Sequence, residues 1–402
     1  MSALRPLRPP FFRLCKSCRR AFSASTRRPS EHVRLIEVGP RDGLQNEKHI
    51  VPFDTKIELI KRLAGTGLRD IEAGSFVSPK WVPQMANSAE ILEHILKTPP
   101  KAPHDISYSF LVPNIKGLEN YLTVSESSSW SRKGSENTSS HEPNAPPTPP
   151  PSPGPYEDTA PITSSENPNE MRSQTFGPGS TSASKSAPSP SSPPTEVSIF
   201  AAATESFSQK NINCSVAESL ERFRPIMTLA KTRNVRVRAY ISVALGCPYE
   251  GPDVSPAKVA ELSATLLEMG ADEISVADTT GMGTAPRTTE LLRTLSASGI
   301  SNKDLAVHFH DTYGQALVNT VVALEHGIRV FDSSVGGLGG CPYSKGATGN
   351  VATEDLVYTL HSLGVTTGVD LEKLATIGSW ISKELGREND SRVGKAVLAR
   401  MD

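Results

Sequence analysis

The stretch SPAKVAELSATLLEMGADEISVAD, residues 255–278, predicts a helix followed by a strand. Ser255 and Pro256 are typical of a helix cap and first turn, and Gly270 is typical of a helix end. The following DEISVAD, residues 272–278, has the length and the β-branched content of a buried strand. If this unit recurs, the chain alternates strands and helices, which is the signature of an α/β fold with a parallel sheet.

The unit does recur. The stretch FDTKIELIKRLAGTG, residues 53–67, places Ile57, Ile60, Leu63 and Ala64 on one helical face. Eight alternating units predict a closed (β/α)₈ TIM barrel, which leaves no sheet edge exposed, with a short helical C-terminal extension. The predicted strands are residues 33–39, 68–74, 106–113, 196–202, 235–243, 272–278, 305–311 and 328–334.

Composition limits the kinds of partner. The 402 residues contain 42 basic and 43 acidic side chains, so no global charge favours nucleic acid or an anionic membrane. No run of about 18 apolar residues predicts a membrane span. The five cysteines form no compact framework, which favours free thiols over disulfides. Cys15 and Cys18 make a CxxC without a second pair, so zinc binding there is weakly supported.

The first 30 residues carry eight Arg and Lys side chains and no acidic one before Glu31. Interspersed Phe, Leu and Ser residues complete the composition of a mitochondrial transit peptide. We therefore expect residues 1–30 to be a targeting segment and the mature protein to reside in the mitochondrial matrix. A basic tail without a targeting role is the alternative.

Residues 125–195 are dominated by Ser and Pro, with runs such as APPTPPPSPGP. Too few large apolar side chains are present to offset the entropy of ordering, so we expect a disordered insertion within a single barrel domain of residues 31–402. The tract falls between a helix at residues 115–126 and the fourth strand, and helix-to-strand loops lie opposite the catalytic face of a barrel. Proline-rich docking on a partner is an alternative to an inert loop.

The stretch VHFHDTYGQ, residues 307–315, places two histidines near a strand end. Alternate residues of a strand share a face, so His308 and His310 point to the same side. Functional residues of a (β/α)₈ barrel gather where strands end. Polar side chains at the predicted strand ends are Arg41, Asp42, Glu72, Asn114, Asp278, His308, His310 and Asp311.

Two imidazoles and a carboxylate suit a divalent cation in an open site, such as Mg²⁺, Mn²⁺ or Zn²⁺, although strand-end histidines can also be purely structural. After the last strand, VGGLGGCPYSKGATGNVATEDL, residues 335–356, surrounds Cys341 and Asn350 with glycines. A thiol and an amide oxygen could thus reach the same rim on a loop. A metal, Arg41 and a thiol favour chemistry beside a carbonyl, with carbon–carbon bond cleavage or formation both open.

Several motifs resemble the 3-hydroxy-3-methylglutaryl-CoA (HMG-CoA) lyase family of metallolyases. They include VGPRDGLQNEK (residues 38–48), VHFHDTYGQAL (residues 307–317) and GLGGCPYSKGATGNVATEDLVY (residues 337–358). The resemblance implies cleavage of HMG-CoA into acetoacetate and acetyl-CoA, in leucine degradation and ketone-body formation. It also implies a small acyl-CoA substrate and a homodimer, with neither nucleic acid nor membrane as partner.

The resemblance further implies roles for individual residues. The Mg²⁺ or Mn²⁺ ligands would be Asp42, His308, His310 and Asn350. Arg41 would bind the substrate and stabilise an enolate, Glu72 would support the site, Cys341 would be a catalytic thiol, and Lys48 would meet the CoA end. Two alternatives are an acyl-CoA condensing transferase of the isopropylmalate or homocitrate synthase type and a non-catalytic scaffold.

Overall fold

The computed structural model describes residues 31–135, 195–340 and 349–401. Several expectations from the sequence lie outside these ranges. They concern the transit peptide, the CxxC of Cys15 and Cys18, most of the Ser/Pro tract, and Cys341.

Eight parallel strands close into a barrel in the order of the chain, so the predicted fold is confirmed. The first strand pairs with the second and also with the last, where Glu37 lies opposite Ser333. The strands are β1 (Arg34–Glu37), β2 (Asp70–Ser75), β3 (Ser107–Leu111), β4 (Thr195–Ala202), β5 (Arg236–Ser242), β6 (Glu273–Asp278), β7 (Leu305–Phe309) and β8 (Val330–Ser333).

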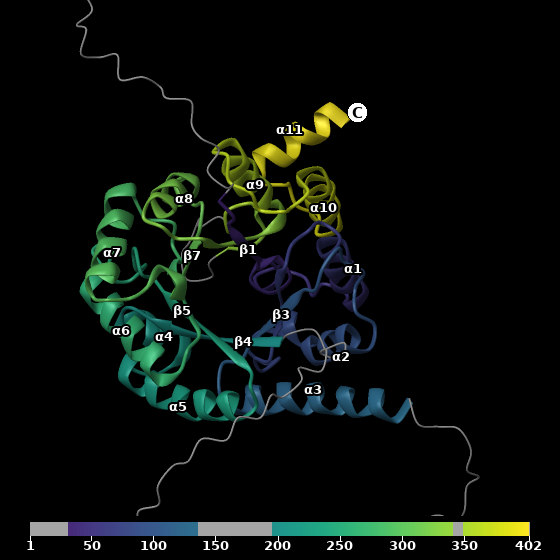
Figure 1. Ribbon diagram of the computed structural model, residues 1–402, viewed down its shortest axis with the longest axis horizontal. Helices are drawn as coiled ribbons and strands as arrows, with labels where there is room; N and C mark the ends of the chain where they lie inside the picture. Colours follow the sequence, from purple (N-terminus) through teal and green to yellow (C-terminus); the bar gives the residue numbers. More distant parts are fainter. Residues whose placement is uncertain (1–30, 136–194, 341–348, 402) are drawn as a thin grey trace, which may run out of the picture. The chain divides into compact units, whose positions relative to one another are not determined.

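Helices surround this ring of strands (Figure 1). They bury the outer faces of the strands in one continuous apolar layer, to which α1 contributes Ile57, Ile60 and Leu63 as predicted. The α-helices are α1 (Phe53–Ala64), α2 (Ser88–Lys97), α3 (Ile115–Ser135), α4 (Glu205–Ile212), α5 (Val216–Thr232), α6 (Pro256–Met269), α7 (Ala285–Ala297), α8 (Ala316–Glu325), α9 (Thr353–Ser362), α10 (Leu371–Glu384) and α11 (Arg392–Met401). Among the described residues, no helix is long and apolar enough to cross a membrane.

Local sequence explains where the helices begin and end. Helix α6 starts after Ser255 and stops at Gly270, whose φ of 112° lets its N–H reach the carbonyl of Leu266. Helix α5 starts with a complete capping box. Ser215 Oγ accepts the N–H of Glu218 at 3.1 Å, and the Glu218 carboxylate accepts the N–H of Ser215 at 2.8 Å.

The starts of the strands hold a layer of charged side chains inside the barrel. Arg34 lies 3.5 Å from Asp70 and also pairs with Glu273, and Arg236 lies 3.3 Å from Glu196. Burial raises the pKa of Glu196 to about 7 despite the neighbouring arginines. Opposite charges therefore close the barrel at the end where each strand begins.

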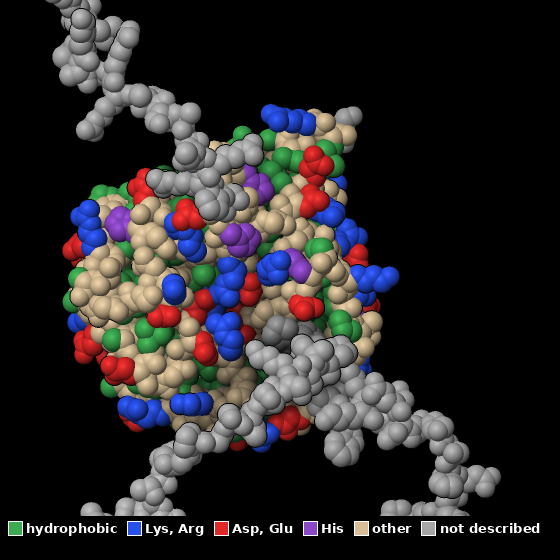
Figure 2. All heavy atoms as spheres, in the orientation of Figure 1, with side chains coloured by type: hydrophobic (Ala, Val, Ile, Leu, Met, Phe, Trp, Pro, Cys, Tyr) green, Lys and Arg blue, Asp and Glu red, His purple; other side chains and the backbone are tan. Residues whose placement is uncertain are grey.

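The C-terminal extension is helical, as expected. Buried Asp355 on α9 accepts hydrogen bonds from Ser391 Oγ at 2.6 Å and from the Val393 N–H at 2.8 Å. These bonds join the start of α11 to α9. On the face shown in Figure 2, acidic and basic side chains are mixed, without a continuous field of one sign.

We expect Ser215→Ala to lower the free energy of unfolding by about 1 kcal/mol, because it removes the oxygen that satisfies a helix N–H. Ser255→Ala is the matched control, since Ser255 occupies the N-cap position of α6 but its side chain makes no capping hydrogen bond. Urea titration followed by circular dichroism measures both. Equal losses in the two variants would contradict the capping argument.

Candidate active site

A short π-helical turn, η2 (Gly39–Gly43), follows β1 and carries Arg41 and Asp42. The carbonyl of Val38 accepts the N–H groups of Asp42 and Gly43 at 2.8 and 3.1 Å. Such single π-turns are frequent at functional sites. This one directs two consecutive charged side chains into the mouth of the barrel.

Asp42, His308 and His310 form a compact buried cluster. One possible ligand atom from each lies within 4.8 Å of the other two. Nowhere else in the described ranges do three His, Cys, Asp or Glu side chains form such a group. The two histidines share a side as the alternation predicted, and the η2 turn that follows β1 supplies the carboxylate.

Asn350 joins this cluster. Its Nδ2 donates to Asp42 Oδ2 at 2.8 Å and to the carbonyl of Leu338 at 3.0 Å. Gly339, with a φ of 122°, makes room for it, because a Cβ there would stand 2.6 Å from Asn350 Nδ2. The buried Asn350 Oδ1 and His310 Nδ1 have no hydrogen-bond partner among the described residues.

These orphaned atoms test whether the cluster fits a metal. Buried polar atoms normally have a hydrogen-bond partner. An amide oxygen and an imidazole nitrogen without such partners therefore fit a site that binds a metal ion. Oxygen and imidazole donors suit a divalent cation. Burial and the nearby His308 lower the pKa of His310 to about 4, which keeps its imidazole neutral as a metal ligand requires.

His308 is oriented by a buried acid–base pair. Its Nδ1 lies 3.1 Å from Asp332 Oδ2, so a proton on Nδ1 leaves Nε2 facing Asp42, which is 4.0 Å away. Arg238 Nη2 donates to Asp332 Oδ1 at 2.7 Å. Although burial opposes ionisation, Arg238 lowers the pKa of Asp332 to about 2.

Arg41 is held on both sides by carboxylates. Its Nε donates to Glu72 Oε2 at 2.7 Å, and its Nη1 donates to Asp42 Oδ1 at 2.6 Å. Burial disfavours its charge, but these anions raise its pKa above the ordinary value. Burial opposes ionisation of Asp42, but Arg41 together with the two histidines and Asn350 lowers the pKa of Asp42. Both residues are therefore charged at neutral pH.

Glu72 is fully buried and faces four donor atoms, two of which, Nε and Nη2, belong to Arg41. Besides Arg41, Ser198 Oγ donates to Oε1 at 2.5 Å and the Tyr240 hydroxyl donates to Oε2 at 3.1 Å. A β-bulge between Glu72 and Gly74 interrupts the register of β2 at this point. Glu72 thus positions Arg41 and is sealed away from solvent.

Two further buried glutamates fix the backbone beside the cluster. Glu37 accepts the N–H groups of Gly39 and Val335, both at 2.9 Å, and Glu354 accepts the N–H of Gly336 at 2.9 Å. Burial raises the pKa of Glu37 to about 7 and that of Glu354 to about 8. They tie η2 to η5 (Val335–Gly337), the turn that precedes the glycine-rich segment.

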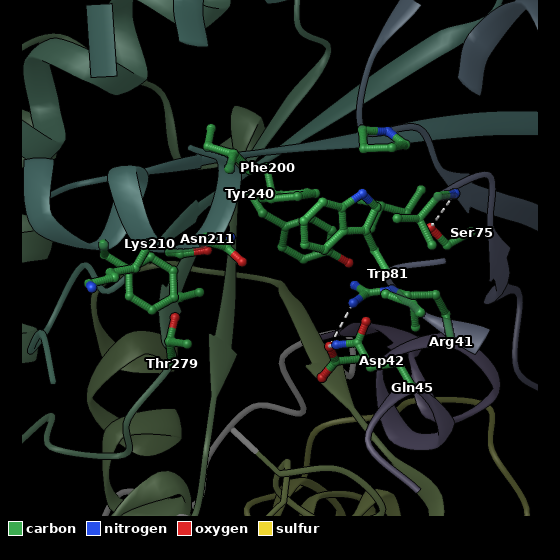
Figure 3. Close-up of a pocket in the computed structure, with 18 of the residues that line it drawn as sticks. Arg41, Asp42, Gln45, Ser75, Trp81, Phe200, Lys210, Asn211, Tyr240 and Thr279 are labelled. Carbon is green, nitrogen blue, oxygen red and sulfur yellow. Dashed lines mark hydrogen bonds and ion pairs between the residues drawn. The ribbon is translucent and has the colours of Figure 1, made fainter. Parts of the chain in front are cut away.

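A pocket of about 1060 Å³ opens above the cluster. In Figure 3, Arg41, Asp42 and Gln45 gather on one side, Lys210 and Asn211 lie on the other, and Trp81 lies on the side of Arg41. The lining includes Ser75, Leu111, Phe200, Phe207, Arg222, Tyr240, Thr279, His308 and His310. The volume accommodates a substrate much larger than a simple hydroxy acid.

The other predicted residues have different places. Lys48 is exposed and is not part of the pocket lining. Asp278 accepts the N–H of Gly283 at 2.9 Å, and Asp311 accepts that of Ala316 at 3.0 Å, so both serve loop structure. Asn114 lines the pocket and also accepts the N–H of Gly117 at 3.0 Å, near the start of α3.

Sequence reasoning missed the residues that support the cluster. Arg238 and Tyr240 lie two positions apart on β5 and point into the barrel, where they meet Asp332 and Glu72. The signal was present, because charged residues in otherwise apolar strands must find buried partners. Gln45, whose Nε2 donates to Asp42 Oδ1 at 2.7 Å, was also missed.

Comparison with known proteins places this barrel in a class of lyases. The HMGL-like family matches residues 32–120 and 183–381. A lyase of Pseudomonas aeruginosa named for 3-hydroxy-3-isohexenylglutaryl-CoA and hydroxymethylglutaryl-CoA is 44% identical over 92% of this chain and 98% of its own. The mitochondrial hydroxymethylglutaryl-CoA lyase of Rattus norvegicus is 43% identical, with 94% of each chain covered.

The fold agrees. The crystal structure of the hydroxymethylglutaryl-CoA lyase from Pseudomonas aeruginosa superposes with a TM-score of 0.71 at 43% identity, covering 92% of this chain and 99% of that one. The chain is a carbon–carbon lyase and belongs to the HMG-CoA lyase family. Relatives named as mitochondrial and as cytoplasmic both occur.

We expect Asp332→Asn to weaken Mn²⁺ binding by about 10- to 100-fold, although Asp332 is not in the cluster, because it orients and polarises His308. Asp311→Asn is the control, since Asp311 follows His310 but serves the α8 loop. Titration calorimetry on folded, metal-free protein measures both. Unchanged affinity in Asp332→Asn would show that His308 needs no such support.

Proposed function

We propose that this lyase cleaves 3-hydroxy-3-methylglutaryl-CoA into acetoacetate and acetyl-CoA, a reaction of leucine degradation and ketone-body formation. The observation that carries the proposal is the buried cluster of Asp42, His308 and His310 with Arg41 beside it in the same large pocket. The names of the family's close relatives support this substrate.

We propose Asp42, His308, His310 and Asn350 as the ligands of a Mg²⁺ or Mn²⁺ ion. When bound, such an ion supplies Lewis-acid stabilisation of negative charge on substrate oxygens. Asp42 is the one carboxylate of the set, and hard cations of this size bind readily through one carboxylate with neutral ligands and water. The four side chains would hold the ion at the strand ends, where the pocket meets the barrel.

Arg41 would stabilise the enolate of the departing acetyl-CoA. Its guanidinium has fixed charge and lines the pocket, and Glu72 and Asp42 fix its orientation before substrate arrives. A preorganised cation aimed at developing charge lowers a barrier without reorganisation during the reaction. Because Glu72 faces four donor atoms, its role would be to position Arg41.

Cys341 would move a proton as the catalytic thiol. It lies outside the described residues, and the proposal follows from its place in the GLGGCPYSKGATGN motif next to Gly340, which lines the pocket. Asn46 Nδ2 donates to the carbonyl of Gly340 at 2.7 Å, which fixes the chain directly before the thiol. Lys48 would meet the anionic CoA end from outside the described pocket.

We also propose a mitochondrial matrix location, directed by residues 1–30, and a homodimer. The basic, acid-free composition of the leader supports the location. The expected bounds of the Ser/Pro insertion, 125–195, are too wide, because residues 125–135 continue helix α3 and Thr195 begins β4. Residues 136–194 would be a disordered insertion without a part in catalysis, since Asp42, His308 and His310 come together on the barrel outside this tract.

Purified protein incubated with HMG-CoA and Mg²⁺ should release equal amounts of acetoacetate and acetyl-CoA, and chelation with EDTA should abolish this release. Acetyl-CoA with 2-oxo acids tests the condensing alternative in parallel. Condensation without cleavage would establish the transferase, and inactivity with both substrate sets would favour the scaffold.

We expect Arg41→Gln to lower kcat on the order of a thousandfold while metal affinity stays nearly unchanged, because charge is needed when the enolate forms. Arg62→Gln is a matched control, since Arg62 lies on the outer helix α1 against the ring of Trp380. Steady-state kinetics and metal titration separate the two effects. A rise in KM alone would instead assign Arg41 to substrate binding.

A further inference from the structure

Trp81 is unusual among the large apolar side chains at the surface. It is 84% exposed, and of the exposed large hydrophobic residues in the described part of the chain it is the one that lines the pocket. An exposed indole leaves a broad apolar, π-rich surface in water, which favours a function in binding. Its position at the rim makes that surface available to a ligand that fills the pocket.

Hydrogen bonds hold the loop that carries Trp81 in place. The carbonyl of Ser78 accepts the N–H of Trp81 at 2.9 Å, and Gln84 Nε2 donates to the carbonyl of Glu47 at 2.5 Å. The buried ammonium of Lys56 donates to the carbonyl of Gln84 and to Asn87 Oδ1. A ring held on a rigid loop loses little conformational entropy when it binds.

The far wall of the pocket carries positive charge. Lys210 and Arg222, from α4 and α5, line the pocket, and neither forms an ion pair with a described carboxylate. Among the described residues, Arg222 Nη1 donates only to the carbonyl of Ile212, at 3.3 Å. In Figure 3, Lys210 lies across the pocket from Trp81. Unpaired cations at the rim suit phosphate groups. The pocket therefore combines a metal cluster at its base with an aromatic ring and cations at its mouth.

An acyl-CoA matches these three features in order. Its acyl end belongs at the metal cluster, its phosphates suit cations, and its adenine is its one aromatic group. We propose that the indole of Trp81 is the stacking platform for the adenine of the CoA substrate. This inference rests on the proposed function and adds a specificity residue for the nucleotide end.

The test compares two substrates, HMG-CoA and its S-pantetheine analogue, which lacks the nucleotide. Loss of one aromatic stack costs affinity on the scale of about tenfold. Trp81→Ala should therefore raise KM for HMG-CoA by about tenfold, with kcat within about twofold, and leave KM for the pantetheine ester unchanged. Trp81→Phe should show a smaller rise. Ile50→Ala, a control at an exposed apolar residue outside the pocket lining, should change neither.

Two results would overturn the proposal. An equal rise in KM for both esters would place the indole against the acyl or pantetheine arm, and no rise for either would make Trp81 a bystander. If the parent protein cleaves neither ester, the proposed function fails separately. Titration calorimetry of adenosine 3′,5′-bisphosphate against the parent and Trp81→Ala then decides the stacking, since the variant should bind it about tenfold more weakly and equal affinities would contradict the stack.

Discussion

The interior of the barrel contains two arginines that are almost sealed from water, Arg238 at 1% exposure and Arg41 at 6%. Each is compensated by carboxylates from other strands, and the Tyr240 hydroxyl links the two by accepting from Arg238 and donating to Glu72. Leaving one member of a buried charge network unpaired costs several kcal/mol. Pairing all of these charges therefore favours this register over any register that leaves one of them unpaired.

The same network positions the candidate metal ligands Asp42 and His308. One end of it, Asp332, orients His308, and the other end, Arg41, holds Asp42. The ligands are thus presented by groups whose own positions are fixed, which is the condition for a precise site. A donor set of one carboxylate and two imidazoles suits a divalent cation.

The alternation of strand and helix patterns predicted the eight strands. The rule that functional residues of a barrel lie at strand ends predicted that Asp42, His308 and His310 come together, because all strands end at one rim of the barrel. Asp311 and Asp278 followed the same rule but serve their loops, because carboxylates there also cap N–H groups. The partnership of Arg238 with Asp332 joins residues 94 apart in the sequence, and no local pattern specifies it. Val243, a β-branched residue with a φ of 55° directly after β5, was equally unpredictable, since only tertiary contacts hold such a conformation.

The two ends of the barrel have different roles. This difference bears on where in the chain a long Ser/Pro-rich tract can be inserted. Arg34, Asp70, Glu196, Arg236 and Glu273 close the end where strands begin, whereas the metal cluster lies where strands stop. Residues 136–194 connect α3 to the start of β4, so they join the barrel at the end that provides stability. A long insertion at this connection is therefore compatible with an intact active site, whereas one of similar length after β7 or β8 would separate His310 from Asn350.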